Sequence, residues 1–317
     1  MQLIDPAPVE RLGADLARIW PEGGREGSRL ALAVSGGPDS LALLALAHAA
    51  LPGRVAVATV DHGLRAEAAD EAAHVARICA DLGVPHETLG VDVADGNVQA
   101  QARVARYAAM AAWMEREGLS ALATAHHADD QAETLVMRLN RGSGVGGLAG
   151  VRERGLVPGT RLALLRPLLG WRRADLAAVA APFDPAQDPS NRNPAFDRVR
   201  VRQALAQSDW VDVSAWSQAA AHLADADAAL DWAAAREWTE GVHKDAMGLT
   251  YRPQAPRAVA LRVVARIVAQ MDEPARGSAV ARLFDTLVAR QPASIGALVV
   301  RPMPGGWSFM KAPKRRA

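Results

Sequence analysis

Short apolar runs alternate with longer amphipathic segments over the first two-thirds of this chain. The runs predict strands, and the segments, in which apolar residues recur at threes and fours, predict helices. Strands rich in Val, Ala and Leu suit a parallel sheet covered by helices on both faces, whose ligands bind at the carboxyl ends of the strands. The expected strands are 30–34, 54–60, 86–91, 120–125 and 162–165, and the expected helices are 40–50, 66–82, 97–117 and 172–180.

The last third of the chain has a different pattern. Helical periodicity dominates at 217–238, 257–271 and 279–290, followed by an apolar run at 295–300 and a basic tail at 311–316. The 317 residues exceed the roughly 100–200 that are typical of one domain. We therefore predict an α/β, Rossmann-like domain over residues 1–208 and a smaller, mostly helical domain over residues 209–317.

Composition excludes several classes of protein. A formal net charge of +1 argues against a protein that coats nucleic acid, although a local basic face is compatible with it. The 33 arginines beside three lysines are explained equally by a GC-rich genome and by phosphate recognition. The lone cysteine, Cys79, lies in an apolar helical pattern and is interpreted as a buried hydrophobe, so no disulfide or cysteine-zinc site is expected.

Two further features bear on location. No stretch of about 18 apolar residues occurs, and charged residues precede any apolar run at the N-terminus, so neither a membrane span nor a signal peptide is indicated. We expect a cytoplasmic protein. Its oligomeric state is not predicted.

The first expected strand runs directly into a Ser-Gly-Gly-Pro-Asp-Ser loop and then into a helix. Two glycines let successive N–H groups approach an anion, and the helix adds its positive N-terminal end. A carboxylate beside such a site is repulsive unless it holds Mg²⁺ or orients a cation, which singles out Asp39. A plain glycine turn with Asp39 as a helix cap is the structural alternative. We predict a pyrophosphate site formed by Ser35, Gly36, Gly37, Pro38, Asp39 and Ser40.

Polar clusters also follow two other strands. Asp61 and His62 follow the second strand and are predicted to lie beside the adenosine of a nucleotide, although a capping role for Asp61 with a surface His62 explains them equally well. A third cluster begins at His126 after the fourth strand. Clusters at three strand ends that converge on one sheet edge predict a site.

The helix after His127 carries a carboxylate pair. We expect Ala132, Leu135, Val136 and Leu139 to form its buried stripe, which leaves Asp130 and Glu133 as an i, i+3 pair that can clamp an ammonium group. A metal centre is the alternative, but no third ligand is evident. We interpret His127 as a residue that contacts phosphate or moves protons.

The hexapeptide resembles the SGGxDS loop of the PP-loop ATPases, which transfer AMP to a substrate oxygen. Together with VDHGLR at 60–65, the long block from HHADDQAET to GLAG at 126–150, RPLLG at 166–170 and DPSNRNPAFDRVRVR at 188–202, the chain is similar to the tRNA(Ile)-lysidine synthetase family over about residues 28–205. Val199 stands where the family commonly has asparagine. The chain is similar to the short form of that family, without further C-terminal domains.

That resemblance implies a function. The family uses ATP and Mg²⁺ to adenylate the C2 carbonyl of the wobble cytidine in a tRNA(Ile) with a CAU anticodon, and L-lysine then displaces AMP, so that the anticodon reads AUA instead of AUG. It implies catalytic roles for Asp39, His127 and Asp129, a Mg²⁺-binding role for Asp39, and lysine recognition by Asp130 and Glu133. The small domain is then expected to interact with tRNA.

Five arginines remain ambiguous between tRNA or phosphate contact and structural ion pairs: Arg138, Arg141, Arg198, Arg200 and Arg202. The G-x-G-x-x-G match at 142–147 follows an expected helix rather than a strand, so we reject a dinucleotide site there. A thiolase is disfavoured by the single cysteine. A non-catalytic tRNA-binding module is disfavoured by intact Ser35, Asp39 and Ser40.

Overall fold

The computed structural model describes residues 5–63, 67–91, 98–186 and 195–312. The chain forms two compact units, Met1–Ala224 and Asp225–Ala317. The division falls inside one continuous helix, α9 (Val213–Gly241), and therefore lies later in the chain than the expected boundary at 208/209. Among the described residues, no helix is long and apolar enough to span a membrane.

The first unit is built on a six-stranded sheet with the order β3-β2-β1-β4-β6-β5. The strands are β1 (Leu30–Ala33), β2 (Val55–Asp61), β3 (His86–Gly90), β4 (Ala121–Ala123), β5 (Arg154–Leu156) and β6 (Ala163–Leu165). All neighbours are parallel except β5, which runs antiparallel to β6. All five expected strands are confirmed, whereas β5 was not expected because its Arg-Gly-Leu sequence has no strand pattern. The strand order reverses at β1, so the loops after β1 and β4 meet at the switch point where α/β sheets bind ligands.

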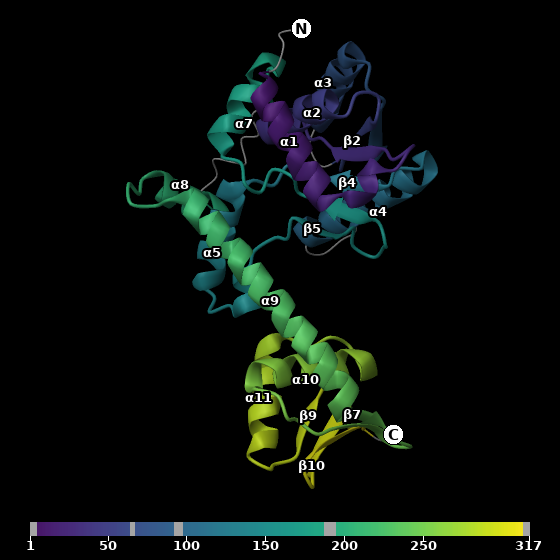
Figure 1. The fold of residues 1–317 in the computed structure, drawn as a ribbon, viewed down its shortest axis with the longest axis vertical. Helices are drawn as coiled ribbons and strands as arrows, with labels where there is room; N and C mark the ends of the chain where they lie inside the picture. The colour runs from purple at the N-terminus through teal and green to yellow at the C-terminus, as the bar shows by residue number, and fades with distance from the viewer. Residues whose placement is uncertain (1–4, 64–66, 92–97, 187–194, 313–317) are drawn as a thin grey trace. The chain divides into compact units, whose positions relative to one another are not determined.

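Helices cover both faces of this sheet. Leu30 and Leu32 pack into a core with α1 (Pro6–Ile19), α2 (Pro38–Ala50), α3 (Glu67–Leu82) and α7 (Arg173–Ala180), whereas Ala31 packs on the other face with α4 (Val98–Glu117). Helix α2 lies against α1 and α7 (Figure 1), and its residues from Ser40 to Ala47 are all buried. A helix that is buried all round has no amphipathic stripe, which explains its uniformly apolar sequence. Short 3₁₀ helices lie at Pro21–Gly24 and Ala181–Phe183.

Three further helices flank the switch point: α5 (Ala128–Leu139), α6 (Val145–Leu148) and α8 (Asp197–Ala206). The expected buried stripe of α5 is wrong at two positions. Leu139 is 54% exposed and Glu133 only 1% exposed. The helix turns Glu133 inward because α8 packs against α5 and supplies arginines to that carboxylate. The 142–147 glycine stretch does follow a helix, α5, and leads into α6.

The second unit combines helices with a five-stranded antiparallel sheet of order β7-β8-β11-β10-β9. Its helices are the end of α9, α10 (Arg257–Met271) and α11 (Gly277–Val288), and all three expected helices are confirmed. Its strands are β7 (Val242–Lys244), β8 (Gly248–Tyr251), β9 (Ala293–Ile295), β10 (Leu298–Met303) and β11 (Gly306–Lys311). This sheet was not predicted, apart from the apolar run in β10. Pairing with neighbouring strands and packing rather than the pattern within one strand stabilise such short strands.

Burial predicts a strong contrast between two leucines. Leu44 in α2 is fully buried, whereas Leu139 in α5 is mostly exposed. We expect Leu44→Ala to lower the free energy of unfolding by about 3–5 kcal/mol, because it leaves a cavity, and Leu139→Ala to change it by less than about 0.5 kcal/mol. Equilibrium urea unfolding followed by circular dichroism measures both. Equal effects of the two variants would contradict this packing.

Candidate active site at the switch point

A cleft of about 670 Å³ opens at the carboxyl ends of β1, β2 and β4. The loop after β1, the residues after β2 and β4, and one face of α4 line it. Its polar lining residues include Ser35, Asp39, Ser40, His62, Arg106, Tyr107, His126, Asp130, Arg173 and Arg202. The structure therefore brings together the three strand ends that the sequence analysis selected.

The glycine loop between β1 and α2 is held by its own serines. The Ser35 N–H donates to Ser40 Oγ at 3.2 Å, and Ser40 Oγ donates to the Gly37 carbonyl at 2.9 Å. Gly36 has φ +84°, a conformation that favours glycine. The loop ends on Gly37 as the N-cap of α2 and Pro38 in its first turn, so the N-terminus of a 13-residue helix faces the cleft. This arrangement is suited to an anion such as pyrophosphate.

Asp39 has the environment expected of a cation ligand. Its Oδ1 is buried and has no hydrogen-bond partner among the described residues, while its Oδ2 lies 3.4 Å from His127 Nε2. A buried carboxylate oxygen without a donor is costly unless something else pairs with it. Mg²⁺ commonly takes one or two carboxylates together with substrate phosphates, so Asp39 beside the anion loop fits that ion. No group of three or more His, Cys, Asp or Glu side chains that could hold a metal occurs in the described part of the chain.

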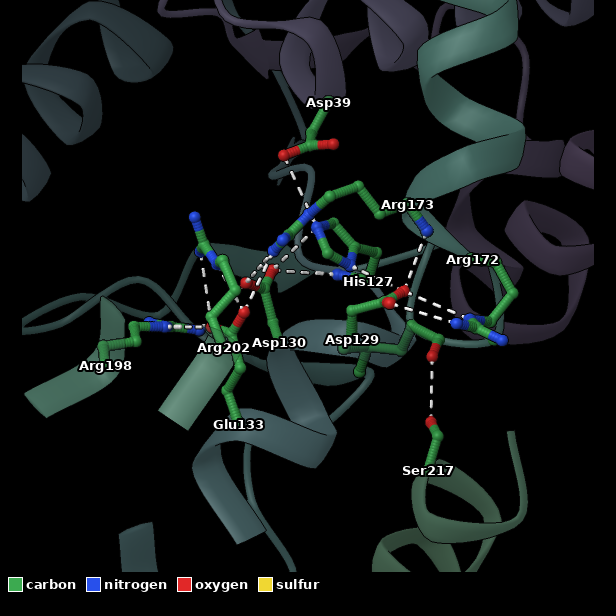
Figure 2. Close-up of polar contacts among 12 residues, drawn as sticks. Asp39, His127, Asp129, Asp130, Glu133, Arg172, Arg173, Arg198, Arg202 and Ser217 are labelled. Carbon is green, nitrogen blue, oxygen red and sulfur yellow. Dashed lines mark hydrogen bonds and ion pairs between the residues drawn. The ribbon is translucent and has the colours of Figure 1, made fainter. Parts of the chain in front are cut away.

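His127 is buried among carboxylates rather than exposed in the cleft. Its side chain is 1% exposed, and its ring nitrogens lie 3.4 Å from Asp39 Oδ2, 3.6 Å from Asp129 Oδ2 and 3.6 Å from Asp130 Oδ2 (Figure 2). Burial alone lowers the pKa of an imidazole, but contacts with Asp129 and Asp39 outweigh it and raise the pKa of His127 to about 9. His127 is therefore a cation at neutral pH, and it positions Asp39 from behind.

His126 has the opposite electrostatic character. It lines the cleft, and its Nδ1 lies 2.9 Å from Thr124 Oγ1. Burial is the main reason that the pKa of His126 is lowered to about 4; the nearby Asp130 raises this pKa, and arginines, Arg166 first among them, lower it. This imidazole is neutral at pH 7 and can accept or donate a hydrogen bond in the cleft.

Asp129 faces α7 instead of the cleft. It accepts a hydrogen bond from the Arg173 backbone N–H at 2.8 Å and two from the Arg172 guanidinium at 3.3 Å (Figure 2). Although burial opposes it, the contacts with His127 and Arg172 lower the pKa of Asp129 below its usual range. The predicted catalytic set is thus adjacent in space, but among Asp39, His127 and Asp129 only Asp39 lines the cleft.

Glu133 and Asp130 share arginines from two helices. Glu133 accepts from Arg198 Nε at 2.7 Å, Arg202 Nε at 2.7 Å and Arg173 at 3.1 Å, and Asp130 accepts from Arg198 at 2.9 Å (Figure 2). Burial raises the pKa of the Glu133 carboxyl, but the contacts with Arg202 and Arg198 lower this pKa by more. The net pKa is below its usual value, so the group is ionised at neutral pH. Asp130 lines the cleft, whereas Glu133 lies beneath it.

Of the remaining residues that were predicted to form the site, some line the cleft or pair with Glu133 and others do neither. Asp61 Oδ1 accepts the Gly63 N–H at 2.8 Å in a local turn and does not line the cleft, whereas His62 does, with a pKa lowered by burial and by Arg106. Arg198 and Arg202 face Glu133, while Arg200 points away and pairs with Asp197 at 2.5 Å. Arg138 is exposed, and Arg141 pairs with Asp197 at 3.7 Å. The parts of two motifs at 64–65 and 188–194 lie outside the described residues.

Sequence reasoning missed several cleft residues. Arg106, Tyr107 and Met110 reach the cleft from α4, and Arg173 reaches it from α7. The sequence pattern of α4 predicted a helix but not which of its residues face the cleft. That orientation depends on how α4 packs across the sheet. The cationic side chain of Arg106 beside an aromatic ring was the one available signal.

This cleft, with an anion loop at the switch point of a parallel sheet, defines a PP-loop protein. Accordingly, the family model described as "PP-loop domain" matches residues 9–209. A tRNA(Ile)-lysidine synthase of Novosphingobium aromaticivorans is 48% identical over 316 residues, which cover 98% of this chain and 95% of that protein. One from Zymomonas mobilis is 41% identical and covers 91% of this chain and 90% of that protein. The chain belongs to the tRNA(Ile)-lysidine synthase family.

Structural similarity extends the fold to a more distant protein. The U34-tRNA thiolase NcsA from Methanococcus maripaludis superposes with a TM-score of 0.54 at 14% identity, covering 69% of this chain and 78% of that one. At that identity the likeness concerns the fold alone.

Burial of Glu133 leads to a prediction about stability. We expect Glu133→Gln to lower the free energy of unfolding by about 1.5–3 kcal/mol, because a buried carboxylate loses its charge-assisted hydrogen bonds to three partly exposed guanidinium groups. Asp197→Asn is the matched control: Asp197 also pairs with arginines but is 56% exposed, so its loss should cost less than about 1 kcal/mol. Urea unfolding of both variants is the measurement, and a Glu133 variant as stable as the control would contradict the buried ion-pair cluster.

Proposed function

We propose that this chain joins L-lysine to C2 of the wobble cytidine of a tRNA(Ile) with a CAU anticodon, which changes codon reading from AUG to AUA. The observation that carries the proposal is similarity over nearly the whole chain to tRNA(Ile)-lysidine synthases, combined with a cleft that holds both an anion loop and opposed charges. The overall reaction consumes ATP and lysine and releases AMP and pyrophosphate. We propose a cytoplasmic location, where such a tRNA is found.

The first half-reaction is adenylation. The C2 carbonyl oxygen attacks the α-phosphate of ATP, the bond to pyrophosphate breaks, and the oxygen carries AMP as a leaving group. Backbone N–H groups of the loop, with Gly36 and Gly37 as the candidates, and the N-terminus of α2 stabilise charge on the phosphates. Asp39 would hold Mg²⁺, which neutralises phosphate charge when bound. His127 keeps the Asp39 carboxylate aimed at that position.

The second half-reaction requires lysine in a fixed orientation. The lysine backbone is a zwitterion, with one ammonium and one carboxylate, so a matching site must offer both signs of charge. Asp130 lines the cleft beside Arg173 and Arg202 and supplies this combination. We propose that Asp130 binds the ammonium group and that Glu133 contributes by holding arginines in place for the carboxylate. The side-chain amine then attacks C2, AMP leaves with its electron pair, and the amine loses a proton.

Incorporation of labelled lysine tests the activity directly. We expect the purified protein to transfer radiolabelled lysine to a tRNA transcript with a CAU anticodon only when ATP is present, and Asp39→Asn to reduce the rate at least about 100-fold, because transition-state charge is left unbalanced. A transcript with a GAU anticodon is the control substrate. No incorporation by folded, ATP-binding protein would rule out the proposed activity.

The assignment of Asp130 yields a second prediction. Asp130→Asn should raise the KM for lysine about 10-fold or more, because an ammonium contact of about 1.5–3 kcal/mol is lost, with little change in ATP binding. Steady-state kinetics at varied lysine, with ATP affinity from isothermal calorimetry, separates the two. An unchanged KM for lysine with a lowered kcat would place Asp130 elsewhere in the reaction.

A further inference from the structure

A second hollow lies in the first unit, between helices α5 and α8. Its volume is about 590 Å³. Apolar and amide side chains form its floor, among them Met137, Asn140, Val201, Ala204 and Leu205. It shares no lining residue with the cleft at the switch point. None of the reaction steps derived above uses this groove.

An unusually exposed tryptophan stands at the edge of the groove. Trp210 is 74% exposed, although an indole of this size is normally largely buried. It packs edge-to-face against Trp216, with ring centroids 5.9 Å apart and planes at 61°. This contact limits the motion of Trp210 while leaving most of its surface open, so the ring is held as a platform.

Cations flank the same groove. Arg141 and Arg200 both line it, and both pair with one carboxylate, Asp197, at 3.7 Å and 2.5 Å. All three side chains are more than half exposed, so these ion pairs are weak and exchange readily for a stronger anion. Two guanidinium groups that share one carboxylate leave net positive charge for a phosphate.

Helices α5 and α8 each carry residues of both the cleft and the groove. Helix α5 presents Asp130 to the cleft and Asn140 to the groove, about 15 Å apart along the helix at 1.5 Å per residue. Helix α8 presents Arg202 to the cleft and Arg200 to the groove. A polynucleotide whose base enters the cleft therefore has this groove within its reach.

We propose that the groove binds an unpaired nucleotide of the RNA substrate, with its base stacked on Trp210 and its phosphate on Arg141 and Arg200. Unpaired bases in RNA loops are recognised by stacking on aromatic side chains, and arginines hold the adjoining backbone. The proposal rests on the proposed function, since it takes tRNA as the substrate. A small groove with an exposed aromatic ring and arginines at its edge is better suited to binding a nucleotide than to binding the surface of another protein.

The experiment compares two substitutions at Trp210 with a control substitution at Leu156, all in the full chain. Trp210→Phe keeps an aromatic face, Trp210→Leu keeps apolar volume without a ring, and Leu156→Ala removes another exposed apolar side chain, 61% exposed, on β5. Binding of the CAU tRNA transcript and of its isolated anticodon stem-loop is measured by fluorescence anisotropy at fixed salt. Lysine incorporation, ATP affinity and melting temperature are measured on the same preparations.

We expect Trp210→Leu to weaken binding of both RNAs by about 5- to 150-fold, the range for loss of one stacked base, with Trp210→Phe near wild type. Leu156→Ala, ATP affinity and melting temperature should not change. Arg141→Gln and Arg200→Gln should each weaken binding and reduce the dependence of log affinity on log salt by about 0.7–1.

RNA binding by Trp210→Leu that equals wild type would overturn the proposal. If unchanged RNA binding is accompanied by a changed sedimentation coefficient of Trp210→Leu, the groove is assigned instead to contact with a second copy of this chain, which also overturns the proposal. The proposed function fails separately: wild-type protein that binds the tRNA through Trp210 but incorporates no lysine would refute the activity and leave the groove assignment standing.

Discussion

The active-site region depends on the ion pairing of the buried Glu133 carboxylate with arginines. A charge that is 1% exposed is strongly unfavourable unless it is paired and hydrogen-bonded. Three guanidinium groups supply that pairing, one from α7 and two from α8. Since Glu133 lies on α5, the cluster connects three helices that are separate in sequence. Helix α5 begins at a capping box formed by His127 and Asp130, which lie beside Asp39 of the anion loop.

Charges around the cleft follow from that arrangement. His127 is held protonated by carboxylates on several sides, whereas His126, one residue earlier, is held neutral by burial and by arginines. Two adjacent histidines thus differ in charge at neutral pH: His127 is protonated and His126 is neutral. A network of this kind presents both signs of charge in fixed positions around the cleft.

Much of the first unit could be predicted from local pattern, because its central strands are apolar runs between helices of clear periodicity. Helix α10 was predicted at its observed bounds. The predicted stripe on α5 was wrong because an apolar-in rule cannot anticipate a carboxylate whose partners lie 40 to 69 residues away in the chain. The second sheet was missed for a related reason. Strands of three or four residues carry little pattern of their own: among the described residues β7 pairs only with the neighbouring β8, and β8 is held in the sheet by β11, more than 50 residues later.

By itself the sequence determined the class of fold, the anion loop at Ser35–Ser40 and the strand ends that converge on it, because strand, turn and helix signals are local. Only the tertiary structure decided which polar residues enter the cleft. It placed Asp39 and Asp130 in the lining of the cleft and buried His127 and Glu133 outside that lining. Asp61 accepts a hydrogen bond within a local turn instead of lining the cleft. The tertiary structure also added Arg106 and Tyr107 from α4. The physical reason is that burial depends on how helices pack together in space, and the segment that contains Glu133 does not contain the arginines that pair with it.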